Sequence, residues 1–226
     1  MKYQYDFDPA DDSTAARLCR LVGHGKKVLE LGCAAGSMTK VLQAHYGCAV
    51  TGVEYDAVAA EVARPYCEAL YVADLNKTPA SNLTNEQFDV VLMADVLEHL
   101  YDSQQQLADV LQVLRPGGQL VISVPNIAHN GILAQLWCGQ FNYTDTGILD
   151  NTHVRFFTPH SLRALLEAAG LTIDHSDTVD TGPHHPEFAA YWQQLPDDLY
   201  TLLQHHTPGQ AYQIIMCASK TESICN

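Results

Sequence analysis

The sequence predicts an α/β fold in which a doubly wound, mostly parallel sheet carries helices on both faces. Short apolar runs alternate with segments of helical spacing through most of the 226 residues, and this alternation is typical of parallel strands joined by helices. The run at 88–93 is almost continuously apolar, as expected of a strand that is covered on both faces. A glycine-containing turn at 32–36 joins the first strand to its helix, which is the arrangement of a nucleotide-binding corner.

The first part of the chain supplies three strands with helices before and between them. A leading helix is expected at 13–22, because Ala15, Leu18 and Val22 lie at helical spacing after the capping residue Ser13. The first strand, Val-Leu-Glu-Leu, feeds a helix through Gly32 and the residues after it. The other elements expected in order are strands at 28–31, 49–54 and 69–73 and helices at 37–44 and 57–63.

The second part of the chain continues the alternation but contains two longer irregular segments. Leu107, Val110 and Leu114 form one apolar stripe and predict a helix at 105–114. Gly170 closes a later helix that begins near Thr158. The expected elements are strands at 88–93, 119–124, 171–174 and 212–219, a sharp turn at 115–118, helices at 105–114 and 161–169, and inserts at about 127–157 and 181–209. We expect one domain over 1–226, with the two inserts acting as lids.

Composition limits the classes of function. The formal net charge is −14, from 26 acidic and 12 basic residues, and such a surface repels nucleic-acid phosphates. The seven cysteines are irregularly spaced without a Cys-x-x-Cys pair, which favours reduced thiols over a zinc site. The polar, aromatic start is unlike a signal segment, and no apolar run reaches membrane-spanning length. We therefore expect a cytoplasmic protein without nucleic-acid or membrane partners.

The glycine turn has a specific spacing. It reads Glu30-x-Gly32-x-Ala34-x-Gly36 and so lacks the Gly-x-Gly-x-x-Gly fingerprint of dinucleotide sites, which disfavours a nicotinamide-dependent oxidoreductase. The spacing resembles the first motif of the class I S-adenosylmethionine-dependent methyltransferases, with Ala34 in place of the middle glycine. Three downstream segments resemble the same family: Phe-Asp-x-Val, then Leu-Glu-His-Leu, then Leu-Arg-Pro-Gly-Gly-x-Leu.

This resemblance covers roughly 26–125 and, more weakly, 153–171. It points to the branch of ubiquinone-biosynthesis O-methyltransferases and related small-molecule and sugar methyltransferases. The implied fold is Rossmann-like, with the last strand antiparallel between the fifth and the sixth. The implied cofactor is S-adenosyl-L-methionine, bound at the carboxyl ends of the strands.

Several residues match the cofactor-binding positions of that family. Glu30 is expected near the sulfonium and amino charges, Glu54 at the ribose hydroxyls, and Asp74 with Leu75 at the adenine. Glu54 could instead be a solvated strand end, and Asp74 a helix cap or turn residue. The full predicted set is Glu30, Gly32, Cys33, Ala34, Gly36, Glu54, Tyr55, Asp74, Leu75, Ala94, Asp95 and His99.

The catalytic residues are predicted from the chemistry of a hydroxyl acceptor, which must lose a proton as it is methylated. His153, after the fifth strand, is the first candidate for the general base, and His129 is the second. His153 could equally be a structural residue that pins the lid to the helix after it. Asp95, Glu98 and His99 resemble a metal-holding segment and would share one face of a helix. We favour the alternative that they only line the cofactor pocket, since hard cations need more oxygen ligands.

The predicted function is S-adenosylmethionine-dependent methylation of a small molecule, on oxygen. N-methylation of an amino sugar or small amine remains an alternative, as does a non-catalytic cofactor-binding partner subunit. The expected partner is the small-molecule acceptor, and a homodimer is left open. The sequence does not identify the acceptor.

Overall fold

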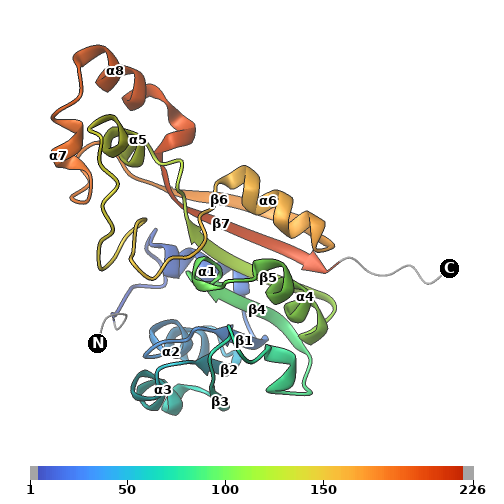
Figure 1. Cartoon of the computed structure of the whole chain (residues 1–226). Coiled ribbons are helices and arrows are strands. Elements are labelled where there is room, and N and C mark those ends of the chain that lie inside the picture. The colour runs from blue at the N-terminus through green and yellow to red at the C-terminus, as the bar shows by residue number, and fades with distance from the viewer. Residues whose placement is uncertain (1–4, 221–226) are drawn as a thin grey trace.

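The protein is built on a sheet of seven strands, and the computed structural model describes residues 5–220 (Figure 1). The order in the sheet is β3-β2-β1-β4-β5-β7-β6. Pairs from β3 to β5 are parallel, whereas β7 is antiparallel to both β5 and β6. The strands are β1 (Lys27–Leu31), β2 (Ala49–Glu54), β3 (Ala69–Val72), β4 (Phe88–Ala94), β5 (Leu114–Pro125), β6 (Leu171–Asp180) and β7 (Ala211–Lys220). The Rossmann-like prediction is confirmed, including the antiparallel last strand.

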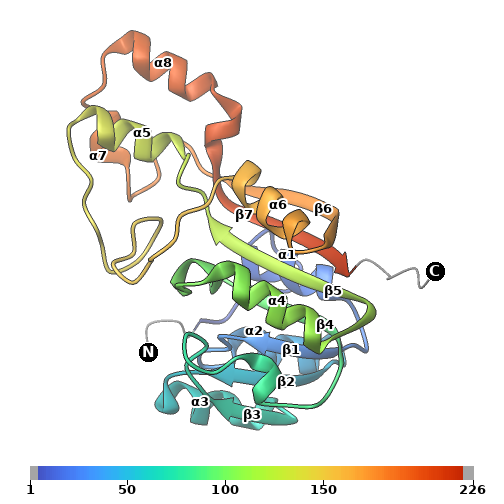
Figure 2. The same ribbon diagram turned by 45° about the vertical axis from the view of Figure 1, so that its right-hand side comes forward.

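Helices cover both faces of this sheet, as Figures 1 and 2 show from two directions. The α-helices are α1 (Thr14–Val22), α2 (Ser37–Ala44), α3 (Ala57–Ala63), α4 (Ser103–Val113), α5 (Asn130–Trp137), α6 (Pro159–Ala168), α7 (Ala189–Trp192) and α8 (Asp197–His205). Short 3₁₀ turns are η1 (Arg64–Tyr66), η2 (Ala80–Asn82), η3 (Leu97–His99) and η4 (Thr207–Gln210). Side-chain caps fix several starts; the Oγ of Ser13 accepts from Ala16 N, and Thr158 forms a capping box with Ser161.

Two apolar cores, one on each face, hold the helices to the sheet. On one face, Leu107 of α4 and Leu162 of α6 pack with Phe88 and the inward side chains of β4 and β5. On the other, Leu18 of α1 and Leu42 of α2 pack against Val90 and its neighbours. Because β4 contributes to both cores, its near-continuous apolar sequence follows from its central position.

Two sequence predictions about the strands are wrong. The sixth strand does not end at Asp174 but continues to Asp180, paired with β7 along its whole length. Its second half is polar because β6 is an edge strand, and Asp177 there forms an ion pair with Arg17 of α1 at 2.8 Å. The segment 115–118 is not a turn that separates two elements. It is an irregularity within β5, where Gly117 has φ 72° and the register to β4 shifts.

The two inserts pack together at the carboxyl end of β5, at the upper left of Figure 1. Helix α5 comes from the first insert, and α7 and α8 come from the second. Their apolar side chains form a third, separate core: Ile132, Ala134, Ile148, Leu149, Phe188, Trp192, Leu195 and Leu203. We call α5, α7, α8 and their connections the cap.

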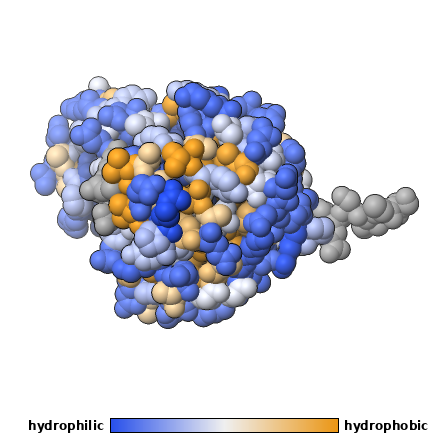
Figure 3. Space-filling view, turned by 90° about the horizontal axis from the view of Figure 1, so that it is seen from below, coloured by the Kyte–Doolittle hydropathy of each residue, from blue (hydrophilic) through white to orange (hydrophobic). Residues whose placement is uncertain are grey.

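Seen from below, the surface is mostly hydrophilic, with hydrophobic residues gathered in one area (Figure 3). The elements that lie lowest in Figure 1 are α2, α3 and β3, and exposed apolar residues on the latter two are Val58, Val62 and Val72. Strand β3 is an edge strand of four residues, and such short edges offer little template for pairing with another chain. Within residues 5–220, no helix has both the length and the hydropathy to cross a bilayer.

Candidate functional site

A cavity of about 670 Å³ opens at the carboxyl ends of β1, β2 and β4. Ligands of open α/β sheets bind at this edge. Eleven of the twelve predicted cofactor residues line it: Glu30, Gly32, Cys33, Ala34, Glu54, Tyr55, Asp74, Leu75, Ala94, Asp95 and His99. Gly36 does not line it. The structure therefore brings nearly the whole predicted set to one place.

The loop 32–36 forms the floor of this cavity through a tight backbone path. Gly32 has φ 71°, and a Cβ atom there would lie 2.6 Å from Cγ2 of Val96. Gly36 has φ 79° and starts α2, where a Cβ atom would lie 2.9 Å from the backbone of Ala63. Gly36 thus serves packing rather than ligand contact. Ala34 also has a positive φ of 48°, which strains a residue with a side chain.

Glu54 ends β2 and is held by two backbone groups. Its Oε2 accepts from Ala34 N at 2.8 Å, and its Oε1 accepts from Asp56 N at 2.9 Å. The side chain is 5% exposed, so the alternative of a solvated strand end is wrong. A carboxylate has about four acceptor sites, and two therefore remain for a ligand in the cavity.

Glu30 is a buried acid in the floor of the cavity. It is 3% exposed, and its Oε2 accepts from Thr39 Oγ1 at 2.6 Å. Burial raises the pKa of Glu30 to about 8, although the Thr39 hydrogen bond lowers it. A buried carboxyl of this kind is neutral near pH 7 until a cation comes close to it.

Two other predicted cofactor residues, Asp74 and Tyr55, lie at the margins. Asp74 forms an ion pair with Lys77 at 2.9 Å, and it accepts from Asn76 N at 3.0 Å. It therefore serves as a turn residue and also lines the cavity, while its contact with the adenine stays a prediction. Tyr55 is 77% exposed and lies at the rim.

The prediction that Asp95, Glu98 and His99 share one face of a helix is wrong. Only Glu98 and His99 belong to the short turn η3, while Asp95 precedes it with φ 53°. The carboxylate of Asp95 instead accepts from Ser123 Oγ at 2.7 Å and from Gln213 Nε2 at 3.2 Å. These bonds tie it to β5 and β7.

A different trio forms from η3 and the first insert. Glu98, His99 and His153 each offer a ligand atom, and these atoms all lie within 4.8 Å of one another. Glu98 is 1% exposed, and both of its carboxylate oxygens lack a hydrogen-bond partner among residues 5–220. Burial raises the pKa of Glu98 well above its usual value, and burial lowers the pKa of His99.

His153 lines the cavity and is 9% exposed, and its role as a base stays a prediction. Its Nδ1 lies 2.9 Å from the carbonyl oxygen of Ile148, which can only accept. In the neutral ring the proton is therefore on Nδ1, and the lone pair is on Nε2. That Nε2 lies 4.0 Å from Oε1 of Glu98. The groups that face the His153 ring at these distances therefore belong to η3 and to the first insert.

His129, the second candidate base, is not brought to the cavity. It caps α5, where its Nδ1 accepts from Gly131 N at 3.1 Å, and its Nε2 lies 3.0 Å from Thr181 Oγ1. It is 1% exposed, and burial lowers its pKa to about 4. Because both ring nitrogens have partners within the cap, His129 has a structural role.

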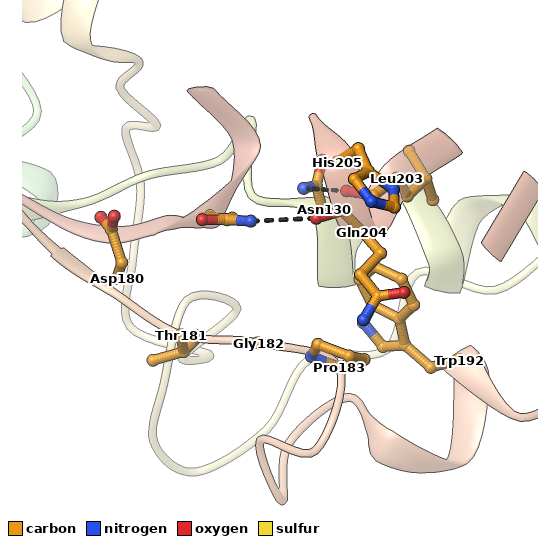
Figure 4. Close-up of a pocket in the computed structure, with 10 residues that line it drawn as sticks. Asn130, Asp180, Thr181, Gly182, Pro183, Trp192, Leu203, Gln204 and His205 are labelled. Atoms are coloured by element: carbon orange, nitrogen blue, oxygen red, sulfur yellow. Dashed lines mark hydrogen bonds between the residues drawn. The ribbon is translucent and has the colours of Figure 1, made fainter. Parts of the chain in front are cut away.

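A second cavity, of about 450 Å³, lies inside the cap (Figure 4). Asp180, Thr181, Gly182 and Pro183 follow one another along one side, with Asn130, Leu203, Gln204 and His205 on the other. Asn130 Nδ2 donates to the carbonyl oxygen of Leu203 at 2.8 Å. None of the predicted site residues lines this cavity, so the larger one is the candidate site.

Comparison with known proteins agrees with the geometry. A family model described as a methyltransferase domain matches residues 10–176, which is most of the chain. The chain belongs to this family. It is an S-adenosylmethionine-dependent methyltransferase, as the sequence motifs predicted.

Curated relatives of this methyltransferase match about three quarters of the chain. It is 27% identical over 168 residues to the ubiquinone biosynthesis O-methyltransferase of Aeromonas salmonicida, covering 73% of this chain and 70% of that protein. It is 28% identical over 177 residues to the mitochondrial ubiquinone biosynthesis O-methyltransferase of Homo sapiens, covering 74% of this chain and 46% of that protein.

Solved structures show the same fold at lower identity. The N-methyltransferase NodS of Bradyrhizobium japonicum, in complex with S-adenosyl-L-homocysteine, has a TM-score of 0.59 and 19% identity, over 97% of this chain and 94% of that chain. A putative methyltransferase of Bacillus halodurans has a TM-score of 0.61 and 17% identity, over 92% and 98%.

The residues present fit the cofactor of a methyltransferase. The carboxyl groups of Glu30 and Glu54 suit a cationic amino acid portion and ribose hydroxyls, and Gly32 allows close approach to the backbone. When bound, S-adenosylmethionine supplies the methyl group on its sulfonium. Sequence reasoning missed other lining residues: Tyr5, Met38, Ser123, Thr146, Gly147, Asp150, Thr152, Tyr212 and Gln213. For those after position 140, the signal lies in the fold, because the last strand and the first insert reach the same sheet edge.

Proposed function

We propose that this methyltransferase methylates a hydroxyl group of a small molecule that lies against Glu98 and His153. The observation that carries the proposal is the pairing of His153 Nε2 with the carboxyl group of Glu98, 4.0 Å apart at the wall of the cavity. A neutral His153 can take up a proton on Nε2, and both carboxylate oxygens of Glu98 lack a hydrogen-bond partner in the part of the chain that the structure describes. The names of the curated relatives, which are O-methyltransferases, support the same choice of atom.

In this mechanism the acceptor hydroxyl gives its proton to Nε2 of His153. The carbonyl oxygen of Ile148, which accepts from Nδ1, stabilises the resulting imidazolium and keeps the ring in one tautomer. Glu98 accepts a hydrogen bond from, or donates one to, a second polar group of the acceptor. Because its pKa is raised well above the usual value, Glu98 does not place a full negative charge beside the developing oxyanion.

The first insert provides the lid of this site. Thr146, Gly147 and Thr152 line the cavity, and Glu187 of the second insert holds that wall in place. Its Oε1 accepts from Ile148 N at 3.1 Å, and its Oε2 accepts from Tyr212 Oη at 2.6 Å. We infer that the two inserts act as one lid over a single domain, excluding water from the methyl transfer.

The test compares His153→Ala with His160→Ala, a control on the exposed face of α6. Acceptor activity is first sought as release of adenosylhomocysteine with catechol, phenol, a methyl glycoside and benzylamine. We expect a hydroxyl probe to be methylated. We also expect His153→Ala to lose roughly 10²–10⁴ in rate, the range for a general base, with cofactor affinity unchanged.

Two outcomes would contradict the proposal. Turnover of benzylamine alone would assign N-methylation. A His153→Ala variant that unfolds at lower temperature but keeps its activity per folded molecule would make His153 a structural residue. Loss of activity in His160→Ala to the same extent would show that the assay reports folding rather than proton transfer.

A further inference from the structure

Cys33 and Cys67 come from opposite sides of β2 and approach each other over Gly52. Cys33 follows β1 and Cys67 precedes β3, while β2 lies between these strands. A Cβ atom on Gly52 would lie 2.9 Å from Cys33 Sγ and 3.1 Å from Cys67 Sγ. Any side chain at this position would therefore occupy the space of the two sulfurs, and Gly52 is what allows them to meet.

The two thiols differ in environment. Cys33 is 4% exposed and lines the cofactor cavity, whereas Cys67 is half-buried and does not line it. Interaction with Cys67, together with burial, raises the pKa of the Cys33 thiol, and interaction with Cys33 lowers the pKa of the Cys67 thiol. The more accessible sulfur is therefore also the better source of thiolate, which is the reactive form.

We propose that Cys33 and Cys67 form a reversible redox-modification site, in which a disulfide between them weakens cofactor binding. The proposal rests on the placement of the cofactor in the larger cavity. Nothing in the methyl-transfer chemistry uses these thiols, and all six cysteines in residues 5–220 are free in this structure.

The oxidant is a low-molecular-weight disulfide, such as oxidised glutathione. The Cys67 thiolate attacks one of its sulfurs; a mixed disulfide forms, and one small thiolate leaves and takes up the proton that Cys67 lost. The Cys33 thiolate then attacks the Cys67 sulfur, and the second small thiolate leaves with the proton of Cys33. Two protein thiols are oxidised, and one disulfide is reduced to two thiols.

The new bond would act on the cofactor through the loop. A disulfide brings its sulfurs to about 2.05 Å, so Cys33 and Cys67 must move toward each other. Its backbone N donates to Val53 O at 3.1 Å, and the next residue, Ala34, donates to Glu54 at 2.8 Å. Displacing Cys33 therefore disturbs both the strained Ala34 and the carboxylate assigned to the ribose.

The experiment equilibrates the whole protein with mixtures of reduced and oxidised glutathione. Peptide mapping by mass spectrometry should find a Cys33–Cys67 link as the first protein disulfide. Calorimetry with adenosylhomocysteine should show at least a tenfold loss of affinity, restored by dithiothreitol. By linkage, saturating adenosylhomocysteine must favour the reduced pair by the same factor and raise its midpoint potential by about 30 mV.

Cys67→Ser and Cys67→Ala are the test variants, and Cys138→Ser is the control, because Cys138 is another partly exposed thiol but lies on the cap. The Cys67 variants should keep their affinity under oxidation, while Cys138→Ser should lose it like the wild type. Absence of the Cys33–Cys67 link, or a link with unchanged affinity, would overturn the proposal. Failure of the reduced wild type to bind adenosylhomocysteine would refute the cofactor placement itself.

Discussion

Glu30 should couple cofactor binding to the release of a proton. Its pKa is raised to about 8 because the carboxyl is buried, so at pH 7 only about a tenth of the free protein has it ionised. A cationic ligand beside it favours the ionised form. Binding at pH 7 should therefore release about 0.9 proton, and ionising Glu30 costs about 1.4 kcal/mol of binding free energy.

The direction of the pH dependence follows from which protonation state of Glu30 binds the cofactor. The ionised form binds the cation, so affinity should rise by about tenfold per pH unit between pH 6 and 7 and level off near pH 8. Calorimetry with S-adenosylmethionine in phosphate and in imidazole, which differ in ionisation enthalpy, measures the released proton directly. Equal binding enthalpies in the two buffers would refute the reasoning.

Two variants separate this effect from other titrating groups. Glu30→Gln should remove the pH slope and the released proton. Thr39→Val removes the hydroxyl that donates to Glu30 at 2.6 Å, so the pKa of Glu30 should rise further and the slope should extend to higher pH.

The same linkage acts on the stability of the unliganded fold. The raised pKa of Glu30 stabilises the unliganded folded protein below pH 4.5. This contribution to the free energy of unfolding is lost as the pH rises through about 8.

The remaining predictions concern the same cavity. Glu54→Ala should weaken S-adenosylmethionine binding by about 1.5–3 kcal/mol in calorimetry, the loss expected for a charged acceptor; unchanged affinity would rule out the ribose assignment. Ala34→Gly should relieve the positive φ of 48° and raise stability to chemical denaturation by about 1 kcal/mol; no gain would mean that the strain is absent. Turnover should survive a chelator. Activity abolished by a chelator and restored by magnesium or zinc would instead make Glu98, His99 and His153 metal ligands, since two imidazoles and a carboxylate are a known zinc set.

Features encoded by neighbouring residues could be predicted from the sequence. The strands up to β5 follow from apolar runs, and the floor of the cavity follows from Gly32 and from Glu54 at the end of β2. These signals are local, because each element shows its own periodicity and the sheet edge gathers whatever follows its strands. The same logic placed eleven of the predicted cofactor residues in one cavity.

Features made by distant residues could not be predicted. The trio of Glu98, His99 and His153 joins η3 to an insert more than fifty residues later, and no spacing rule links them. Asp95 was misplaced because its neighbours were assigned to a helix, whereas the chain forms a single 3₁₀ turn. The cap role of His129 depends on Thr181, which the fold brings from the second insert.

The order of the strands also determines when this protein can finish folding. Strand β6 reaches the rest of the sheet only through β7, which is the last strand in the chain. A ribosome-bound chain that lacks β7 can form the part of the sheet made by strands β1 to β5, but β6 cannot yet join it. Until then, Ile173 and the apolar side of α6 lack part of their core. Such long-range closure is intrinsically slow. The final step must therefore wait until β7 has left the ribosome, and chaperone dependence should be concentrated in that interval.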